Sequence, residues 1–244
     1  MRRIRIHVEL ALAEGADIVL PAAAAGHVAR VLRLAAGDGV TLFNGDGNDY
    51  AAELVTVDRR AVTARVQAVQ AVANESPLAL TLAQGLARGE KMDLVVQKAT
   101  ELGVARIVPL LSERSEVRLD SARSDKRLQH WRAIAAGACE QCGRARVPAI
   151  AAPRALDEWA GSLDGDGVLR LALLPDARHG PRGLAVPSAG AILVAGPEGG
   201  LGDRDVATLR AAGFAGLRLG PRILRTETAG LAALAALQAL YGDL

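Results

Sequence analysis

The sequence Gly196-Pro197-Glu198-Gly199-Gly200 follows directly after the apolar run Ala191–Ala195. The run predicts a buried strand, and the next segment, Asp203–Ala212, predicts a helix. A glycine-rich turn between a strand and a helix N-terminus lets the backbone approach a bound molecule closely. This stretch therefore indicates a ligand cradle in an α/β sheet.

A second glycine turn lies about 20 residues further on, in Leu219-Gly220-Pro221-Arg222-Ile223-Leu224-Arg225-Thr226-Glu227-Thr228-Ala229. It also leads into a helix start, and it carries two arginines, one glutamate and two threonines. Two such loops so close together in the chain indicate one pocket built from both.

The first loop does not fit the common phosphate-binding motifs. It lacks the Gly-Lys-Ser/Thr of a P-loop, and its glycines at 196, 199, 200 and 202 do not give G-x-G-x-x-G. Glu198 would repel a pyrophosphate held in this loop, so a ligand with cationic or neutral polar groups is favoured. A tight turn without a ligand stays open as the alternative.

Composition sets the limits on the kind of core and partner. The chain has 244 residues, enough for one large or two small domains, and its hydrophobic content of 50% includes only 2% aromatic residues. The net charge of +2 does not by itself indicate nucleic acid. Residues 106–146, however, hold nine basic and five acidic residues, a local charge of +4. This segment is either a solvated helix face or a surface that faces RNA.

Nothing at the N-terminus predicts export or membrane insertion. Arg2, Arg3 and Arg5 lead into an alternating strand, and no stretch of about 18 uncharged apolar residues exists, so we expect a cytoplasmic protein. Cys139 and Cys142 form a C-x-x-C inside a predicted helix, with no second pair and no nearby histidine. We interpret them as two small helix residues and expect no metal.

The pattern of elements predicts two domains. Residues 1–72 read mainly as strands with a hairpin turn at Asn44–Asn48 and a short helix over Gly26–Leu34, which indicates a small β-barrel. A linker at Ala73–Pro77 is followed by alternating strands and helices in residues 73–244, which indicates an α/β domain. Its expected strands are 78–85, 105–110, 168–174, 191–195 and 217–219, and its expected helices are 89–102, 125–143, 203–212 and 226–241.

Several motifs along most of the chain resemble one family when they are taken in order. They are Lys91-Met92-Asp93, Gln97–Val104, Ile107–Leu110, Ser112-Glu113-Arg114, Glu140–Arg144 with Val147-Pro148, both glycine loops, and, near the N-terminus, His27–Leu34, Gly37-Asp38 and Leu42–Gly45. Together they resemble the RsmE family, the bacterial 16S ribosomal RNA uridine-N3 methyltransferases of the SPOUT class. Three positions depart from the family pattern: Asp205 stands where a glutamate is expected, Leu201 where an aromatic is common, and His7 where an aromatic is expected.

The resemblance implies an α/β methyltransferase domain with a deep trefoil knot, preceded by a PUA-like β-barrel that helps hold RNA. It implies a homodimer, S-adenosylmethionine as cofactor, and 16S ribosomal RNA of the small ribosomal subunit as substrate. The knot would bring the two glycine loops and the end of strand Val168–Leu174 together around the cofactor. The implied reaction is methylation of N3 of a specific uridine on the assembled subunit.

The resemblance and the loop chemistry together assign candidate site residues. Arg225 is the first candidate for orienting the base or a phosphate and for stabilising the uracil anion. Glu198 or Glu227 could accept a proton or hold a partner arginine, and Glu227 has the alternative of a first-turn helix carboxylate. The expected cofactor lining is Leu174, Ala195, Gly196, Pro197, Gly199, Gly200, Leu219, Gly220, Ile223, Leu224 and Thr226.

Four residues are candidates for RNA binding: Arg30, Arg114, Gln141 and Arg144. For Gln141 and Arg144 a structural role, such as a salt bridge, is an equal alternative. Two other functions also stay open. One is methylation of another RNA or of a ribose hydroxyl by the same fold, and the other is a ribosome-assembly RNA-binding protein without catalysis.

Overall fold

The computed structural model describes residues 4–58, 61–116, 120–164, 167–185 and 187–244, and the chain divides into two compact units. The N-terminal unit comprises residues 1–75 together with 136–147, and the C-terminal unit comprises 76–135 and 148–244. The division therefore runs through one long helix, α3 (Ser121–Cys142). The expected domain boundary at residue 72 stays a prediction, and the structure adds residues 136–147 to the N-terminal unit.

The N-terminal unit contains a five-stranded sheet in the order β1-β3-β4-β5-β2. β1 and β3 are parallel, and the other neighbours are antiparallel. Its strands are β1 (Arg5–His7), β2 (Asp17–Val19), β3 (Gly39–Phe43), β4 (Asn48–Val57) and β5 (Val62–Ala71). The short helix expected over 26–34 is α1 (Ala22–Gly26) followed by a turn of π-helix, η1 (His27–Leu32), which ends at Arg33 with φ of 55°.

Alternating burial explains how this sheet forms a core. Tyr50, Ala52 and Leu54 of β4 are buried, and the residues between them are more exposed, as expected of a strand with one face inside. The predicted turn between β3 and β4 is present and is stabilised by Asp46. Its carboxylate accepts hydrogen bonds from the Asn48 N–H at 2.8 Å and the Tyr50 hydroxyl at 2.6 Å.

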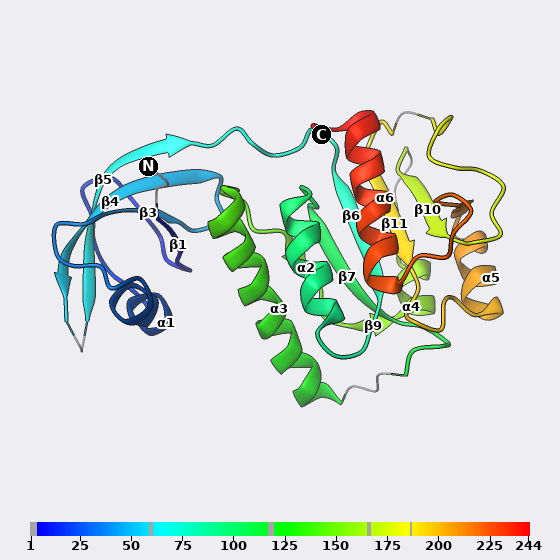
Figure 1. Cartoon of the computed structure of the whole chain (residues 1–244), viewed down its shortest axis with the longest axis horizontal. Coiled ribbons are helices and arrows are strands. Elements are labelled where there is room, and N and C mark those ends of the chain that lie inside the picture. The colour runs from blue at the N-terminus through cyan, green and yellow to red at the C-terminus, as the bar shows by residue number, and fades with distance from the viewer. Residues whose placement is uncertain (1–3, 59–60, 117–119, 165–166, 186) are drawn as a thin grey trace. The chain divides into compact units, whose positions relative to one another are not determined.

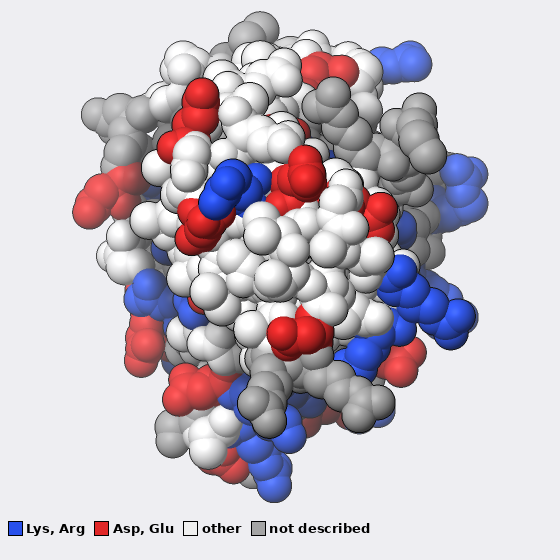
Figure 2. Space-filling view, turned by 90° about the vertical axis from the view of Figure 1, so that its left-hand side faces the viewer, with Lys and Arg blue, Asp and Glu red and all other residues white. Residues whose placement is uncertain are grey.

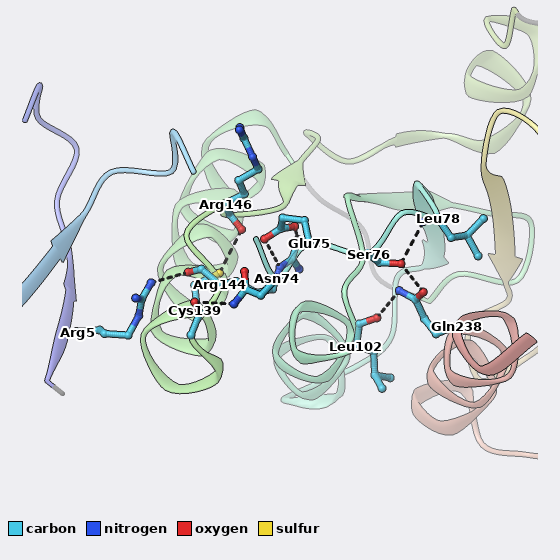
Figure 3. A network of polar contacts seen from close by, with 11 residues as sticks. Arg5, Asn74, Glu75, Ser76, Leu78, Leu102, Cys139, Arg144, Arg146 and Gln238 are labelled. Atoms are coloured by element: carbon cyan, nitrogen blue, oxygen red, sulfur yellow. Dashed lines mark hydrogen bonds and ion pairs between the residues drawn. The ribbon is translucent and has the colours of Figure 1, made fainter. Parts of the chain in front are cut away.

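Residues 136–147 are joined to the rest of the N-terminal unit by polar contacts (Figure 3). The Arg144 guanidinium forms a double hydrogen bond with Glu75, at 3.1 and 2.6 Å. Arg5 donates to the Arg144 carbonyl at 3.0 Å, and Asn74 donates to the Gly143 carbonyl at 2.9 Å. These contacts satisfy backbone carbonyls after the end of α3, which otherwise lack partners.

The C-terminal unit contains a seven-stranded sheet whose pairs are all parallel, in the order β12-β10-β11-β6-β7-β8, with β9 also paired to β7. The strands are β6 (Leu80–Gly85), β7 (Arg106–Leu111), β8 (Ala149–Ile150), β9 (Arg154–Ala155), β10 (Leu169–Leu173), β11 (Ala191–Ala195) and β12 (Ala215–Leu217). The helices are α2 (Lys91–Glu101), most of α3, α4 (Leu156–Gly161), α5 (Asp203–Ala211) and α6 (Thr226–Tyr241).

Helices cover both faces of this sheet, with α2 and α6 in front of the strands in the view of Figure 1. One face packs on α4 and α5: Ala83 and Val194 share a core cluster with Trp159. The next residue along β6, Leu82, faces Gly230 of α6 on the other side. Because both faces are covered, the strands are continuously apolar rather than alternating, as expected for a parallel sheet.

Most predicted boundaries differ from the structure by one or two residues, and the short elements β8, β9 and α4 were not predicted. Two boundaries differ in a way that bears on the site or on the division of the chain. The long helix begins at Ser121 rather than at 125, because Asp120 accepts a hydrogen bond from the Arg123 N–H at 2.8 Å and acts as its cap. The strand expected at 217–219 is Ala215–Leu217, and its last residue pairs with Leu173. The strand Ala191–Ala195 was predicted correctly.

Within the described part of the chain, no helix has both the length and the apolar composition needed to cross a membrane. Cys139 and Cys142 lie in α3 and form no disulfide. A hydrogen bond with Cys142, together with burial, raises the pKa of the Cys139 thiol, so its reactive thiolate is disfavoured at neutral pH.

Candidate functional site

A cleft of about 1080 Å³ opens at the carboxyl ends of the central strands of the C-terminal unit. The strand register brings these ends together, since Ala195 pairs with Gln84 and Leu173 pairs with Leu217. Both glycine loops and the end of β10, at Leu173 and Leu174, line the cleft. The expectation that these three segments meet in one pocket is therefore realised in the structure.

All but one of the residues expected to line the cofactor site line this cleft. The exception is Ala195, which is buried as the last residue of β11, below the first loop. Ile223 lines the cleft but is 84% exposed, so it forms part of the rim rather than the floor.

The first loop is a tight turn that requires glycine at particular positions. The Gly200 N–H donates to the Pro197 carbonyl at 2.8 Å, and Gly200 has a φ of 71°, a conformation that other residues rarely adopt. A Cβ added to Gly196 would lie 2.8 Å from the backbone carbon of Gly200. The loop therefore closes onto its own backbone, which leaves main-chain atoms facing the cleft.

A buried hydrogen-bond network joins the two loops. Gln84 Nε2 donates to the Gly196 carbonyl at 3.3 Å and to Thr226 Oγ1 at 3.1 Å, and the Thr226 hydroxyl donates to the same Gly196 carbonyl at 2.6 Å. Thr226 thus fixes the start of α6 against the first loop. Sequence reasoning missed Gln84, although a glutamine at the end of an otherwise apolar strand was the available signal.

Glu198 projects from the first loop toward α2. Its carboxylate accepts hydrogen bonds from Lys91 Nζ at 2.8 Å and from the Arg88 N–H at 3.1 Å. Burial raises the pKa of Glu198, but the bonds from Lys91 and the Arg88 N–H outweigh it and lower the pKa below its ordinary value. Glu198 is therefore held as an anion, which makes it a weak proton acceptor.

A second acidic residue, Asp205, fixes the other end of the first loop. It accepts hydrogen bonds from the Gly202 N–H at 2.9 Å and from the Glu113 N–H at 3.1 Å. The aspartate therefore serves the capping role for α5 although the family pattern favours the longer glutamate. Arg114, a candidate for RNA binding, donates to the Gly199 carbonyl at 3.2 Å and lines the cleft.

Arg225 and Glu227 lie where the second loop enters α6. Arg225 is the exposed residue before the first helical turn, and its carbonyl accepts hydrogen bonds from the Thr228 and Ala229 N–H groups. Glu227 lines the cleft, and its Oε2 is buried without a hydrogen-bond partner among the described residues. An unpartnered carboxylate oxygen in a cleft of this kind suits a cationic or hydrogen-bond-donating ligand.

The other candidates for RNA binding belong to the N-terminal unit. The Arg144 side chain is only 6% exposed and forms an ion pair with Glu75. These contacts agree with the salt-bridge role that the sequence analysis gives as the alternative to RNA binding. Arg30 and Gln141 are exposed.

Figure 2 shows a face of the molecule on which acidic and basic side chains surround a patch without charge. Basic side chains gather along one edge of this face. RNA binding by these residues stays a prediction.

The cleft fits a cofactor of nucleoside size. Its volume is that of a small-molecule site. Its two glycine loops expose backbone groups that can hydrogen-bond a heterocycle, and Glu227 offers a carboxylate for a positive charge.

Comparison with known proteins agrees with this geometry. The family model described as an RNA methyltransferase domain matches residues 74–238, and the model described as an RNA methyltransferase PUA domain matches residues 20–67. The chain is 31% identical over 240 residues to the ribosomal RNA small subunit methyltransferase E of Buchnera aphidicola, covering 98% of this chain and 97% of that protein.

Two solved structures are similar over almost the whole chain. One, from Legionella pneumophila and described as a methyltransferase with bound cofactor SAM, has a TM-score of 0.96, 40% identity and full coverage of both chains. The other, the ribosomal RNA small subunit methyltransferase E of Neisseria gonorrhoeae bound to S-adenosyl methionine, has a TM-score of 0.92, 35% identity and 99% coverage of both chains.

Fold and cleft thus define an α/β RNA methyltransferase domain that follows an N-terminal PUA domain. Within that class, the chain belongs to the RsmE family, the family of the ribosomal RNA small subunit methyltransferase E.

Proposed function

We propose that this chain uses S-adenosylmethionine to methylate N3 of a uridine in 16S ribosomal RNA on the assembled small subunit. The observation that carries the proposal is the single cleft formed by both glycine loops in a member of the RsmE family. Relatives that are 40% and 35% identical were solved with S-adenosylmethionine bound. A protein that acts on ribosomal RNA in this way works in the cytoplasm.

Positioning is the first contribution of the protein. Bound S-adenosylmethionine supplies an activated methyl group, and the reaction is an in-line displacement that depends on alignment. Holding two reactants in the reactive geometry can lower the barrier by roughly 7–11 kcal/mol. The network of Gln84, Thr226 and the Gly196 carbonyl fixes the separation of the two loops, and so it fixes the width of the cleft.

The nucleophile needs help as well, because the N3 of uridine carries a proton. Its departure requires a proton acceptor or a cation that stabilises the developing uracil anion. We assign the cation to Arg225, which is exposed at the start of α6 on the cleft. Glu227 is the better proton acceptor of the two candidates, because its Oε2 has no donor among the described residues, whereas Glu198 is bonded to Lys91.

We also propose that the active form is a C2 homodimer, with residues of both chains completing each site. Apolar side chains are exposed on or near α2 and α6: Leu94 at 42%, Leu240 at 45% and Ile223 at 84%. Exposed apolar groups on neighbouring elements favour an interface. Light scattering of the purified protein tests this, and a monomer at working concentration would contradict it.

The nucleoside composition of ribosomal RNA tests the reaction itself. Mass spectrometry of 16S RNA from cells with and without the gene should show loss of one N3-methyluridine. Loss of a ribose-methylated nucleoside, or of a transfer RNA modification, would support a different target for the same fold. Unchanged RNA together with no calorimetric binding of S-adenosylmethionine would support a non-catalytic role in ribosome assembly.

A further inference from the structure

The cleft carries a group of arginines that are paired with no carboxylate of the described residues. Arg210 lies in the last turn of α5, Arg218 follows β12, and Arg222 and Arg225 lie in the second loop; all four are exposed and line the cleft. None forms an ion pair with another residue in the described part of the chain. The lining holds six cationic residues in all, against the four carboxylates Asp176, Glu198, Asp203 and Glu227.

Several other cations of the chain have carboxylate partners. Arg204, also on α5, is paired with Asp157 at 2.9 Å, and Arg65 is paired with Asp17 at 2.7 Å. In the cleft lining itself, Lys91 is paired with Glu198 at 2.8 Å, and Arg114 donates to the Gly199 carbonyl at 3.2 Å. Among the described cations of this lining, those without such a partner therefore lie at the end of α5, directly after β12 and in the second loop.

The backbone beneath two of these arginines, Arg210 and Arg218, is fixed. The Arg218 N–H donates to the His179 carbonyl at 2.9 Å, directly after the buried residue Leu217. Arg210 is carried on α5, whose Leu209 is buried in the core cluster with Trp159. The Cα positions of Arg210 and Arg218 are thus anchored while their side chains are exposed, which reduces the entropy lost when they bind a ligand.

We propose that Arg210, Arg218 and Arg222, in the lining of the cleft, form a binding surface for the phosphate backbone of single-stranded RNA. The inference rests on the proposed function and names the part of the protein that holds the substrate strand next to the methyl donor. Guanidinium groups bind phosphate oxygens in a planar, two-pronged geometry, and RNA offers phosphates at regular spacing. RNA binding is thereby assigned to the C-terminal unit as well as to the PUA domain.

The test measures binding of a fluorescein-labelled single-stranded oligouridylate as a function of salt concentration. Each phosphate contact contributes about 0.7 to the slope of log K against log salt for single strands. The triple variant R210Q/R218Q/R222Q should therefore lower the slope by about 2 and weaken binding at low salt by about 10- to 100-fold. The matched control is R204Q, whose side chain is exposed on the same helix but paired with Asp157.

Two further measurements make the result unambiguous. Calorimetric binding of S-adenosylmethionine should be unchanged in the triple variant, and circular dichroism should show the wild-type fold. An unchanged salt slope in the triple variant would overturn the inference, as would an equal loss in R204Q. A loss of cofactor affinity with an unchanged slope would also overturn it, because it would assign these arginines to the cofactor's carboxylate. Failure of the wild type to bind the cofactor would instead count against the proposed function.

Discussion

Arg144 and Arg225 show how differently two regions of this molecule use the same residue type. Arg144, in the N-terminal unit, is 6% exposed and makes a double hydrogen bond to Glu75. Arg225, on the cleft of the C-terminal unit, is exposed and has no ion pair among the described residues. Burial with a partner makes an arginine structural, whereas exposure beside a cleft leaves its charge available to a ligand.

The same contrast applies to the carboxylates of the cleft. Glu198 accepts hydrogen bonds from Lys91 and the Arg88 N–H, while Glu227 has a buried oxygen that no donor in the described part of the chain reaches. One of these two glutamates, Glu198, therefore helps to hold the first loop in place, and the other, Glu227, is available to a ligand. The following variants separate these two roles.

The largest effect is expected for Arg225→Ala. Loss of the cation that stabilises the uracil anion should lower the single-turnover methylation rate by about 10²- to 10³-fold, with cofactor affinity near the wild-type value. Arg225→Lys should restore only part of the rate, because a lysine ammonium lacks the planar fork. The measurement uses small ribosomal subunits and saturating cofactor. A full rate in the alanine variant would place Arg225 among the structural arginines.

The second largest effect is expected for Arg144→Ala, and it concerns stability. Removing one partner of a largely buried pair leaves Glu75 without its counter-charge, which should cost about 3 kcal/mol of unfolding free energy. Urea denaturation measures it, and Arg65→Ala is the control in the same unit. The exposed Arg65–Asp17 pair should contribute much less, because water screens the attraction between its charges. Equal losses in the two variants would contradict the distinction.

An intermediate effect is expected for Gly196→Ala. The added methyl would lie 2.8 Å from the Gly200 backbone, so the first loop must shift. Overpacking costs about 1–3 kcal/mol, which corresponds to about a 10- to 100-fold loss in affinity for S-adenosylmethionine by calorimetry. The control is Gly161→Ala at the end of α4, where an added Cβ meets nothing within 4 Å. Wild-type affinity in Gly196→Ala would show that the loop does not shape the cofactor site.

The smallest effect is expected for Glu198→Gln, and it should depend on pH. The pair with Lys91 is partly exposed, so its loss should cost only about 0.5 kcal/mol. Because the pKa of Glu198 is lowered in the folded state, its contribution is present above its ordinary pKa and disappears as the pH falls through the folded value. Urea midpoints of wild type and variant should therefore differ at neutral pH and converge in acid. A difference that persists in acid would indicate a cause other than the carboxylate charge.

Local sequence patterns were sufficient for the longer elements and for the loops of the site, but not for the short elements β8, β9 and α4. Glycines, a capping residue and an apolar run leave signals within a few residues of one another, as in Ala191–Gly200. The family resemblance added the PUA domain and the methyltransferase class, and the comparisons confirmed both. The trefoil knot, the dimer and the roles of individual site residues stay predictions.

Other features were decided only by the tertiary structure. Whether Arg144 or Arg225 finds a carboxylate depends on residues far away in sequence, such as Glu75, which lies 69 positions from Arg144. Gln84 becomes the link between the loops only because β6 and β11 are neighbours in the sheet. The sequence determines which groups each segment carries, but long-range packing determines which of them are paired, because pairing requires two distant segments to be brought within hydrogen-bonding distance.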